Sequence, residues 1–210
     1  MKLISSYINA LPKAEWIYQS GIPWLKLDIN VPFQEIEEEW NNVSHLAVYH
    51  RDNDQIYNLK NFGWKSLTIY GVSSDITVES TGNHQWTEIA EMCPKTTEWI
   101  KNNFIINETT RRIRFMYLEP GGYILPHRDR DFSKLSEINV AISHPSKCYF
   151  KFKNYGIIPF SNGDAFIIDT SKEHAVHNQS NSARLHIILH TSISDELIEK
   201  SYGNSYHIKN

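Results

Sequence analysis

Short runs rich in apolar residues dominate the second half of the chain. After Asn107 they follow one another closely, and turn residues such as Gly121-Gly122 and Ser161–Asp164 separate them. These runs cover residues 113–117, 123–125, 138–142, 148–152, 165–168 and 185–189. Successive side chains of a strand point to opposite faces, so several short strands joined by tight turns predict a β-sandwich or barrel. A jelly roll is the compact solution for such a set of strands.

The first half of the chain mixes helical and extended patterns. Phe33, Ile36 and Trp40 have helical spacing with glutamates between them, which predicts a helix with a solvated acidic face. Further helices are expected over 86–92 and 94–104, and strands over 24–27, 46–49 and 66–70. We therefore expect one domain over residues 1–210. Its parts are a mixed α/β flank (1–107), a jelly-roll core with the metal site (108–192) and a C-terminal tail (193–210).

Composition narrows the class of protein. The chain is 40% hydrophobic and 21% charged with a net charge of −3, which suits a globular protein and argues against a nucleic-acid partner. No apolar run approaches the roughly 20 residues that span a bilayer, and the first residues lack the apolar core of a signal peptide. We therefore expect a cytoplasmic protein with no membrane partner. Two cysteines are too few for a disulfide framework, and the oligomeric state stays open.

The stretch from Arg112 to Asp131 carries the first chemical signal. Its residues His127 and Asp129 are two apart in an extended segment, so both side chains face one way and can hold one metal ion. His174 and His177 are the candidates for a third ligand. Two histidines and a carboxylate leave adjacent positions of an octahedral ion open, as in non-haem Fe(II) oxygenases. The arginines beside these ligands, Arg128 and Arg130, are expected to be exposed.

The last strong strand carries the second signal. Alternation places Arg184, His186 and Ile188 on one face of that strand. An arginine that points into a barrel is costly unless it meets an anion. Its planar guanidinium suits a carboxylate bound through two hydrogen bonds, so a dicarboxylic cosubstrate is the natural partner.

Together these residues resemble the iron- and 2-oxoglutarate-dependent dioxygenases, and within them the aspartyl/asparaginyl β-hydroxylase-like group that includes bacterial proline hydroxylases. The resemblance covers residues 112–190 and rests on three patterns, namely His127-x-Asp129, His174-x3-Asn178-x5-Arg184 and the Gly-Gly lead-in. It implies a mainly β fold with a double-stranded β-helix core (jelly roll, cupin-like) and flanking helices, mostly from the N-terminal half.

The resemblance also implies roles for single residues. The iron ligands would be His127, Asp129 and His174, because the spacing from His174 to Asn178 and Arg184 matches the family pattern. Arg184 would bind the distal carboxylate of 2-oxoglutarate. Where the peptidyl-aspartate hydroxylases have Arg-x-His, this chain has Glu137-Ile138-Asn139, and Asn139 is expected to contact the cosubstrate instead.

The expected cofactors are Fe(II), 2-oxoglutarate and O2, with ascorbate in support. The expected reaction is hydroxylation of an unactivated C–H bond in a small molecule. The carboxylate ligand Asp129 favours a free amino acid or a close derivative as substrate and argues against halogenation. The alternatives are a peptidyl Asp or Asn residue, a jelly roll that holds a metal such as zinc without oxygenase activity, and a sugar-binding jelly roll. Trp64 and Trp86 lie in segments expected to cover the pocket.

Overall fold

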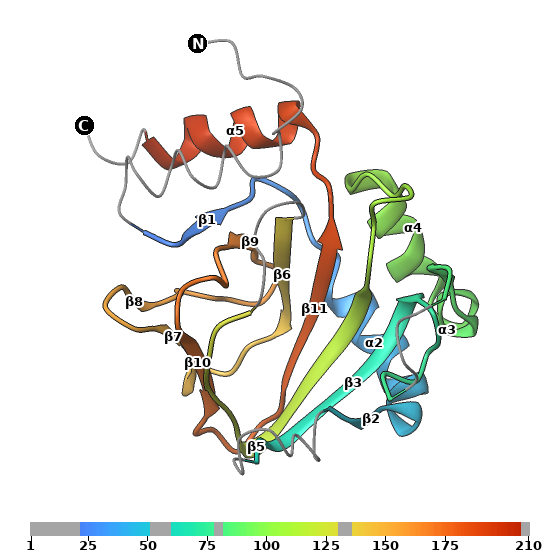
Figure 1. Ribbon diagram of the computed structural model, residues 1–210, viewed down its shortest axis with the longest axis horizontal. Coiled ribbons are helices and arrows are strands. Elements are labelled where there is room, and N and C mark those ends of the chain that lie inside the picture. The colour runs from blue at the N-terminus through green and yellow to red at the C-terminus, as the bar shows by residue number, and fades with distance from the viewer. Residues whose placement is uncertain (1–21, 51–59, 78–81, 130–135, 207–210) are drawn as a thin grey trace.

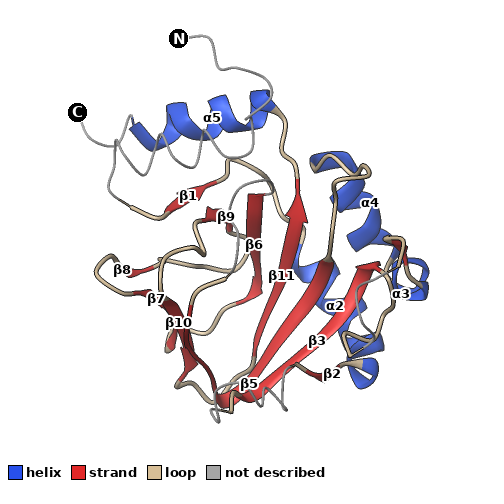
Figure 2. Cartoon of the chain, in the orientation of Figure 1, coloured by secondary structure: helices blue, strands red, loops and turns tan. Residues whose placement is uncertain are grey.

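The computed structural model describes residues 22–50, 60–77, 82–129 and 136–206. Its antiparallel strands form one hydrogen-bonded sheet that curls over itself, and helices cover one side of it (Figure 1). The strand order is β1-β9-β6-β11-β5-β10-β7-β8, and β3 pairs with β5 as well. Figure 2 shows the strands as two facing halves, which we call the main sheet and the second sheet.

The two halves share one long strand, β5 (Ile113–His127). The main sheet contains the first part of β5 together with β1 (Trp24–Lys26), β3 (Phe62–Gly71), β6 (Ser136–Ser143), β9 (Ala165–Ile168) and β11 (Arg184–Thr191). Two short strands pair with the edge strand β3, namely β2 (Val48–Tyr49) and β4 (Gln85–Trp86). The second sheet contains the last part of β5 together with β7 (Cys148–Phe152), β8 (Gly156–Ile157) and β10 (His174–Asn178).

Strand β5 passes from one half to the other at its glycine pair. Up to Leu118 it pairs with β3 and β11, and from Tyr123 onward it pairs with β10. Gly121 has φ 74°, a conformation that a side chain disfavours. A Cβ on Gly122 would lie 2.8 Å from the carbonyl oxygen of Glu119. The expected turn between two strands is therefore a bend within one strand, because β3 keeps pairing with β5 on both sides of it.

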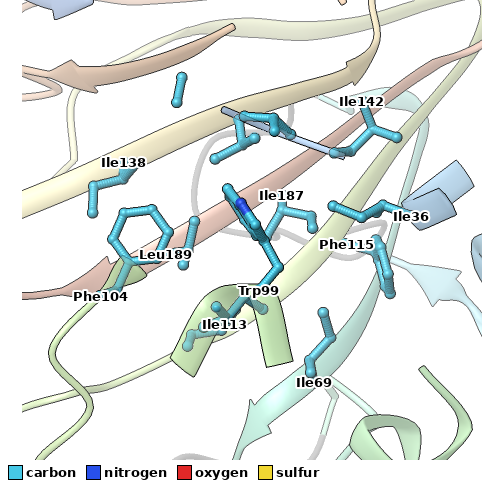
Figure 3. Close-up of a cluster of buried hydrophobic side chains, with 14 of the residues drawn as sticks. Ile36, Ile69, Trp99, Phe104, Ile113, Phe115, Ile138, Ile142, Ile187 and Leu189 are labelled. Atoms are coloured by element: carbon cyan, nitrogen blue, oxygen red, sulfur yellow. The ribbon is translucent and has the colours of Figure 1, made fainter. Parts of the chain in front are cut away.

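Alternation along β5 separates two hydrophobic cores. Ile113 and Phe115 face the helices and belong to the outer core, whereas Met116 and Leu118 face the second sheet and belong to the inner core. The helices of the outer core are α2 (Phe33–Val43), α3 (Glu88–Met92) and α4 (Pro94–Asn103). Figure 3 shows Trp99 and Ile36 packed against the sheet residues of this core. The outer core thus fixes the main sheet, and the inner core holds the two halves together.

The expected fold class is confirmed: the protein is mainly β, with a jelly-roll core and flanking helices. Some local expectations differ from the structure. Ser44–Leu46 forms a 3-10 helix, which shortens the strand expected over 46–49, and Trp86 lies in β4 before α3. The tail contains a helix, α5 (Asp195–Tyr206), that packs near β1. Within the described part of the chain, no helix is long and apolar enough to cross a membrane.

The acidic face expected on α2 has one exception, Glu39. Its side chain is buried, and its carboxylate accepts hydrogen bonds from the backbone N–H groups of Lys95 (2.8 Å) and Thr96 (2.9 Å) and from the Thr96 hydroxyl (2.6 Å). These donors lie in the first turn of α4, whose backbone N–H groups have no partner within the helix. Glu39 therefore anchors α4 to α2.

Candidate metal and cosubstrate site

Two strands of the second sheet bring His127 and His174 side by side. His127 ends β5, His174 begins β10, and the two are paired across the antiparallel ladder. Their ring centroids lie 4.3 Å apart. Asp129 follows His127 by two residues, and its backbone N–H donates a hydrogen bond to the carbonyl oxygen of Thr170 (3.1 Å). This bond ties the end of β5 to the segment before β10, so the three side chains converge.

The three side chains fit a metal ion. Asp129 Oδ1 lies 3.7 Å from His127 Nε2, and Asp129 Oδ2 lies 3.7 Å from His174 Nε2. Two atoms that bind one ion through bonds of about 2.1 Å can be at most about 4.2 Å apart, and both Asp129 distances meet that limit. The candidate ligand atoms of all three residues lie within 4.8 Å of one another. The His174 side chain is 4% exposed and that of Asp129 37%. The site is therefore anchored in the barrel and open on the side of Asp129.

Backbone carbonyl groups set the tautomer of both histidines. His127 Nδ1 lies 2.7 Å from the carbonyl oxygen of Leu125, and His174 Nδ1 lies 2.9 Å from that of Lys172. A carbonyl oxygen only accepts, so each Nδ1 carries the hydrogen and each Nε2 presents its lone pair to the cluster. Burial, and then the charge that His127 can carry, lower the pKa of His174. His174 is therefore neutral near pH 7, as metal binding requires.

Hydrogen bonds within the segment before β10 hold the Lys172 and Thr170 carbonyl groups in place. The Asp169 carboxylate accepts hydrogen bonds from the backbone N–H (3.1 Å) and hydroxyl (2.5 Å) of Ser171. The Lys172 N–H donates to the Asp169 carbonyl oxygen (3.2 Å). Thr170, which accepts from Asp129, donates its hydroxyl hydrogen to Glu137 Oε2 (2.5 Å). A tight turn and a side-chain brace therefore support the three candidate ligands.

His177 does not join the cluster. It lies three residues further along β10 on the opposite face, where its side chain is exposed. Its Nδ1 lies 3.1 Å from the side-chain amide nitrogen of Gln179, and its ring meets Tyr123 edge-on. The structure thus brings His174, and not His177, to His127 and Asp129.

Arg184 lies in the barrel between the two sheets. It is 1% exposed, and Nη2 lies 2.9 Å from His186 Nδ1. Its Nε has no hydrogen-bond partner among the residues that the structure describes. Within the described residues it forms no ion pair with an acidic side chain. Burial lowers the pKa of Arg184 to about 10, so the guanidinium remains charged at pH 7. A buried cation with an unused donor is suited to an anion from outside the chain.

Three polar residues surround Arg184 or lie close to it. His186 and Asn139 are buried, and His186 Nδ1 lies 2.5 Å from Asn139 Oδ1. His144 Nδ1 lies 2.9 Å from His186 Nε2. His186 lies on the same face of β11 as Arg184, as alternation predicts. No local pattern marks His144, because its partner His186 is 42 residues away in the sequence.

Other expected residues lie elsewhere. Arg128 is exposed, and Arg130 is outside the described residues. Trp64 packs in the inner core against His50 (centroids 4.0 Å apart), whereas Trp86 contacts Tyr70 on the outer core. A separate hollow lined by Thr68, Gly71, Val72, Ser73, Asp75, Ile76, His84 and Arg112 contains none of the three candidate ligands.

Solved structures with the same fold include a prolyl-4-hydroxylase and a member of the 2OG-Fe(II) oxygenase family. A prolyl-4-hydroxylase from Pseudomonas putida has a TM-score of 0.50 at 10% identity, covering 87% of this chain and 97% of its own. An oxidoreductase of the 2OG-Fe(II) oxygenase family from Burkholderia pseudomallei has a TM-score of 0.52 at 10% identity (88% and 90% covered). AviO1 from Streptomyces viridochromogenes Tue57 has a TM-score of 0.50 at 10% identity (90% and 96% covered). These identities are low, so the likeness shows the fold.

The sequence itself shows the family. No curated protein matches the chain significantly. Residues 31–192, however, match the family described as Aspartyl/Asparaginyl beta-hydroxylase, and this range includes α2, α3, α4 and the whole candidate site. The chain therefore belongs to the aspartyl/asparaginyl β-hydroxylase family and is a hydroxylase.

Proposed function

We propose that this hydroxylase uses Fe(II), 2-oxoglutarate and O2 to hydroxylate an unactivated C–H bond of a free amino acid or a close derivative. One observation carries the proposal: the His-Asp-His cluster and the buried charge of Arg184 lie in the same barrel. When bound, iron and cosubstrate would supply the oxidising power, with O2 and 2-oxoglutarate consumed, succinate and CO2 released, and one oxygen atom inserted into the C–H bond. Ascorbate would keep the iron reduced.

Each residue of the cluster has a definite task in this proposal. His127 and His174 bind the metal through Nε2, and Asp129 binds it through a carboxylate oxygen. Three ligands on one face leave the other positions open to cosubstrate and O2. The stacked ring of Phe150, 5.3 Å from that of His174 between centroids, keeps water from the buried side. The open side near Asp129 admits the substrate.

Arg184 binds the distal carboxylate of 2-oxoglutarate. Its Nε–H and the Nη hydrogens that do not face His186 are the donors for this contact. A guanidinium binds a carboxylate through two parallel hydrogen bonds, and the buried setting strengthens both. Asn139 contacts His186, which in turn contacts Arg184. Asn139 therefore lies at the end of the pocket where Arg184 binds the cosubstrate, and it contacts the cosubstrate there.

The inner face of the main sheet supports a free amino acid as substrate. Alternation along β5 places Arg114 on the same face as Met116, and alternation along β6 places Glu137 on the same face as Asn139. Arg114 is 6% exposed, and Glu137 braces Thr170 beside Asp129. An amino acid carries a carboxylate and an ammonium group, which match one cation and one anion. We assign Arg114 to the substrate carboxylate and Glu137 to its ammonium group.

Metal binding is the first test. Anaerobic calorimetric titration with Fe(II), and with Mn(II) as a redox-stable substitute, should give one ion per chain. His127→Ala removes a ligand and should weaken metal binding by more than about 100-fold. Removing a residue that only hydrogen-bonds to a metal ligand already lowers metal affinity about 10 to 100-fold. His177→Ala, an exposed histidine of the same sheet, is the matched control and should bind normally. Equal loss in both variants would contradict the assigned ligands.

Succinate release tests the reaction and the substrate. With Fe(II), ascorbate and 2-oxoglutarate, a panel of free amino acids should raise succinate above the His127→Ala background. Arg114→Gln should raise the KM for the amino acid and leave the Kd of 2-oxoglutarate unchanged. If only peptides containing Asp or Asn stimulate succinate, the free-amino-acid assignment is wrong and the alternative of a peptidyl substrate holds. No stimulation by either class, with no uncoupled succinate, would refute the oxygenase reaction.

A further inference from the structure

A chain of hydrogen bonds connects Arg184 to the backbone of β7. Arg184 Nη2 lies 2.9 Å from His186 Nδ1, His186 Nε2 lies 2.9 Å from His144 Nδ1, and His144 Nε2 lies 2.9 Å from the carbonyl oxygen of Cys148. The four residues come from three segments of the fold: β11, the loop after β6, and β7. Both ends of this chain have a fixed hydrogen-bonding role, because a guanidinium only donates and a carbonyl oxygen only accepts.

The two ends determine the tautomer of each histidine. The Cys148 carbonyl accepts, so His144 Nε2 carries a hydrogen, and in a neutral ring His144 Nδ1 must then accept. His186 Nε2 therefore donates to it, which leaves His186 Nδ1 as the acceptor for Arg184. Burial and the nearby Arg184 charge lower the pKa of His144 to about 4 and that of His186 well below its usual value. Both rings are thus neutral, and each link pairs one donor with one acceptor.

A contact between Asn139 and His186 provides a check on this assignment. Its Oδ1 faces His186 Nδ1 at 2.5 Å, and two lone pairs would repel if that nitrogen is an acceptor. The amide must therefore turn over so that its NH2 group faces the ring, where it shares the single lone pair of Nδ1 with Arg184. The turn costs no space because the two ends of the amide have nearly the same shape. In the opposite assignment, His186 would donate to Asn139, and the neutral His144 would turn a lone pair toward the Cys148 carbonyl. A backbone carbonyl within a strand cannot turn away from that lone pair, so the opposite assignment leaves two acceptors facing each other.

Aromatic packing holds the rings of this chain. Phe160 meets His186 edge-on with centroids 4.7 Å apart, and it lies 5.2 Å from the ring of His144. His186 is 0% exposed. The imidazoles therefore have little freedom to rotate. The hydrogen bond between Nη2 and His186 restricts the rotation of the Arg184 guanidinium in turn. The unpartnered Nε of Arg184 remains as a donor in a fixed place.

We propose that His186, supported by His144 and Asn139, is a positioning residue that holds the Arg184 guanidinium in the orientation in which it binds the cosubstrate carboxylate. This inference rests on the proposed role of Arg184 in binding 2-oxoglutarate. His186 accepts one hydrogen bond from Arg184 and carries no charge. The full positive charge of Arg184 is thus left for the ligand, whereas an aspartate or glutamate in the same place would neutralise it.

Binding of 2-oxoglutarate to the Mn(II)-loaded protein, measured by calorimetry, tests the positioning role without turnover. His186→Leu removes the acceptor and should raise the Kd of 2-oxoglutarate about tenfold, equivalent to about 1.4 kcal/mol, with Mn(II) affinity unchanged. His186→Asn places a side-chain oxygen near the position of Nδ1 and should recover most of the affinity. His177→Leu is the surface control. An unchanged Kd in His186→Leu, with normal binding by the wild type, would overturn the inference.

Nitrogen-15 NMR of the wild-type imidazoles provides a second test, which requires no variant. His144 and His186 should both show the neutral form with hydrogen on Nε2. Hydrogen on Nδ1 of His186, or a charged ring at pH 7, would overturn the inference even if the variants fail to fold. Absence of 2-oxoglutarate binding in the wild type contradicts the proposed function instead, so the two failures can be told apart.

Discussion

Replacing Arg184 by methionine should make the metal-free protein more stable while it abolishes 2-oxoglutarate binding. Burial lowers the pKa of Arg184 from 12.5 to about 10. A shift of that size corresponds to about 3 kcal/mol by which the fold disfavours the charged form, at 1.36 kcal/mol per pKa unit. Methionine has a similar length and no charge, so Arg184→Met removes this penalty.

The substitution also has a cost. His186 Nδ1 loses the donor at 2.9 Å, and the loss of this buried hydrogen bond costs about 1 to 2 kcal/mol. The net expected gain in the free energy of unfolding is therefore about 1 to 2 kcal/mol. For a domain of this size that raises the melting temperature by about 2 to 8 °C. The stabilising shift that 2-oxoglutarate gives to the Mn(II)-loaded wild type should disappear.

Urea unfolding of the metal-free wild type and variant measures this directly. Arg111→Met is the matched control, because Arg111 is exposed near the start of β5, and it should change stability by less than about 0.5 kcal/mol. A loss of 1 kcal/mol or more in Arg184→Met would refute the reasoning. It would mean that the guanidinium stabilises the fold and is not held for a ligand.

Three further predictions concern stability. The free energy of unfolding should fall as pH drops below about 6.5, by up to about 1.4 kcal/mol per pH unit for each of His144 and His186. Burial lowers the pKa of His144 to about 4 and that of His186 well below its usual value. Only the unfolded chain therefore takes up these two protons in this pH range. Urea titrations from pH 7.5 to 5 check the sign, and flat stability would contradict it. Gly122→Ala should destabilise the fold more than Gly121→Ala. A Cβ at position 122 meets backbone oxygens, whereas a Cβ at position 121 has nothing within 4 Å. The Gly122→Ala variant should therefore have the lower melting temperature of the two. Glu39→Ala should cost about 2 to 3 kcal/mol in urea unfolding by leaving buried donors of α4 unpaired, and a change within 0.5 kcal/mol would show that water replaces the carboxylate.

Periodicity along the chain was enough to predict most of the fold. The apolar-rich runs over 113–117, 138–142 and 185–189 correspond to β5, β6 and β11, and helical spacing from Phe33 to Trp40 corresponds to α2. These signals are local, because the period of the backbone decides which side chains share a face. The two-residue spacing of His127 and Asp129 belongs to the same class of signal, and their ligand atoms do converge with that of His174.

Other features depended on pairing between distant segments. The sequence HAVHN at 174–178 has no clean alternation, yet it forms β10 because β5 and β7 supply hydrogen bonds on both sides. That pairing turns His174 inward and His177 outward, whereas in the sequence only the family spacing to Asn178 and Arg184 favoured His174. Glu39 faces the start of α4 for the same kind of reason.

By itself the sequence determined the strands, their inner faces and a family pattern that includes His127, Asp129, His174 and Arg184. Only the tertiary structure decided what surrounds these residues. The curled sheet brings His144, from the loop after β6, to His186 on β11, and it buries Arg184 without an acidic partner among the described residues. Contacts of this kind depend on how the two halves of the barrel close, and no local period encodes that closure.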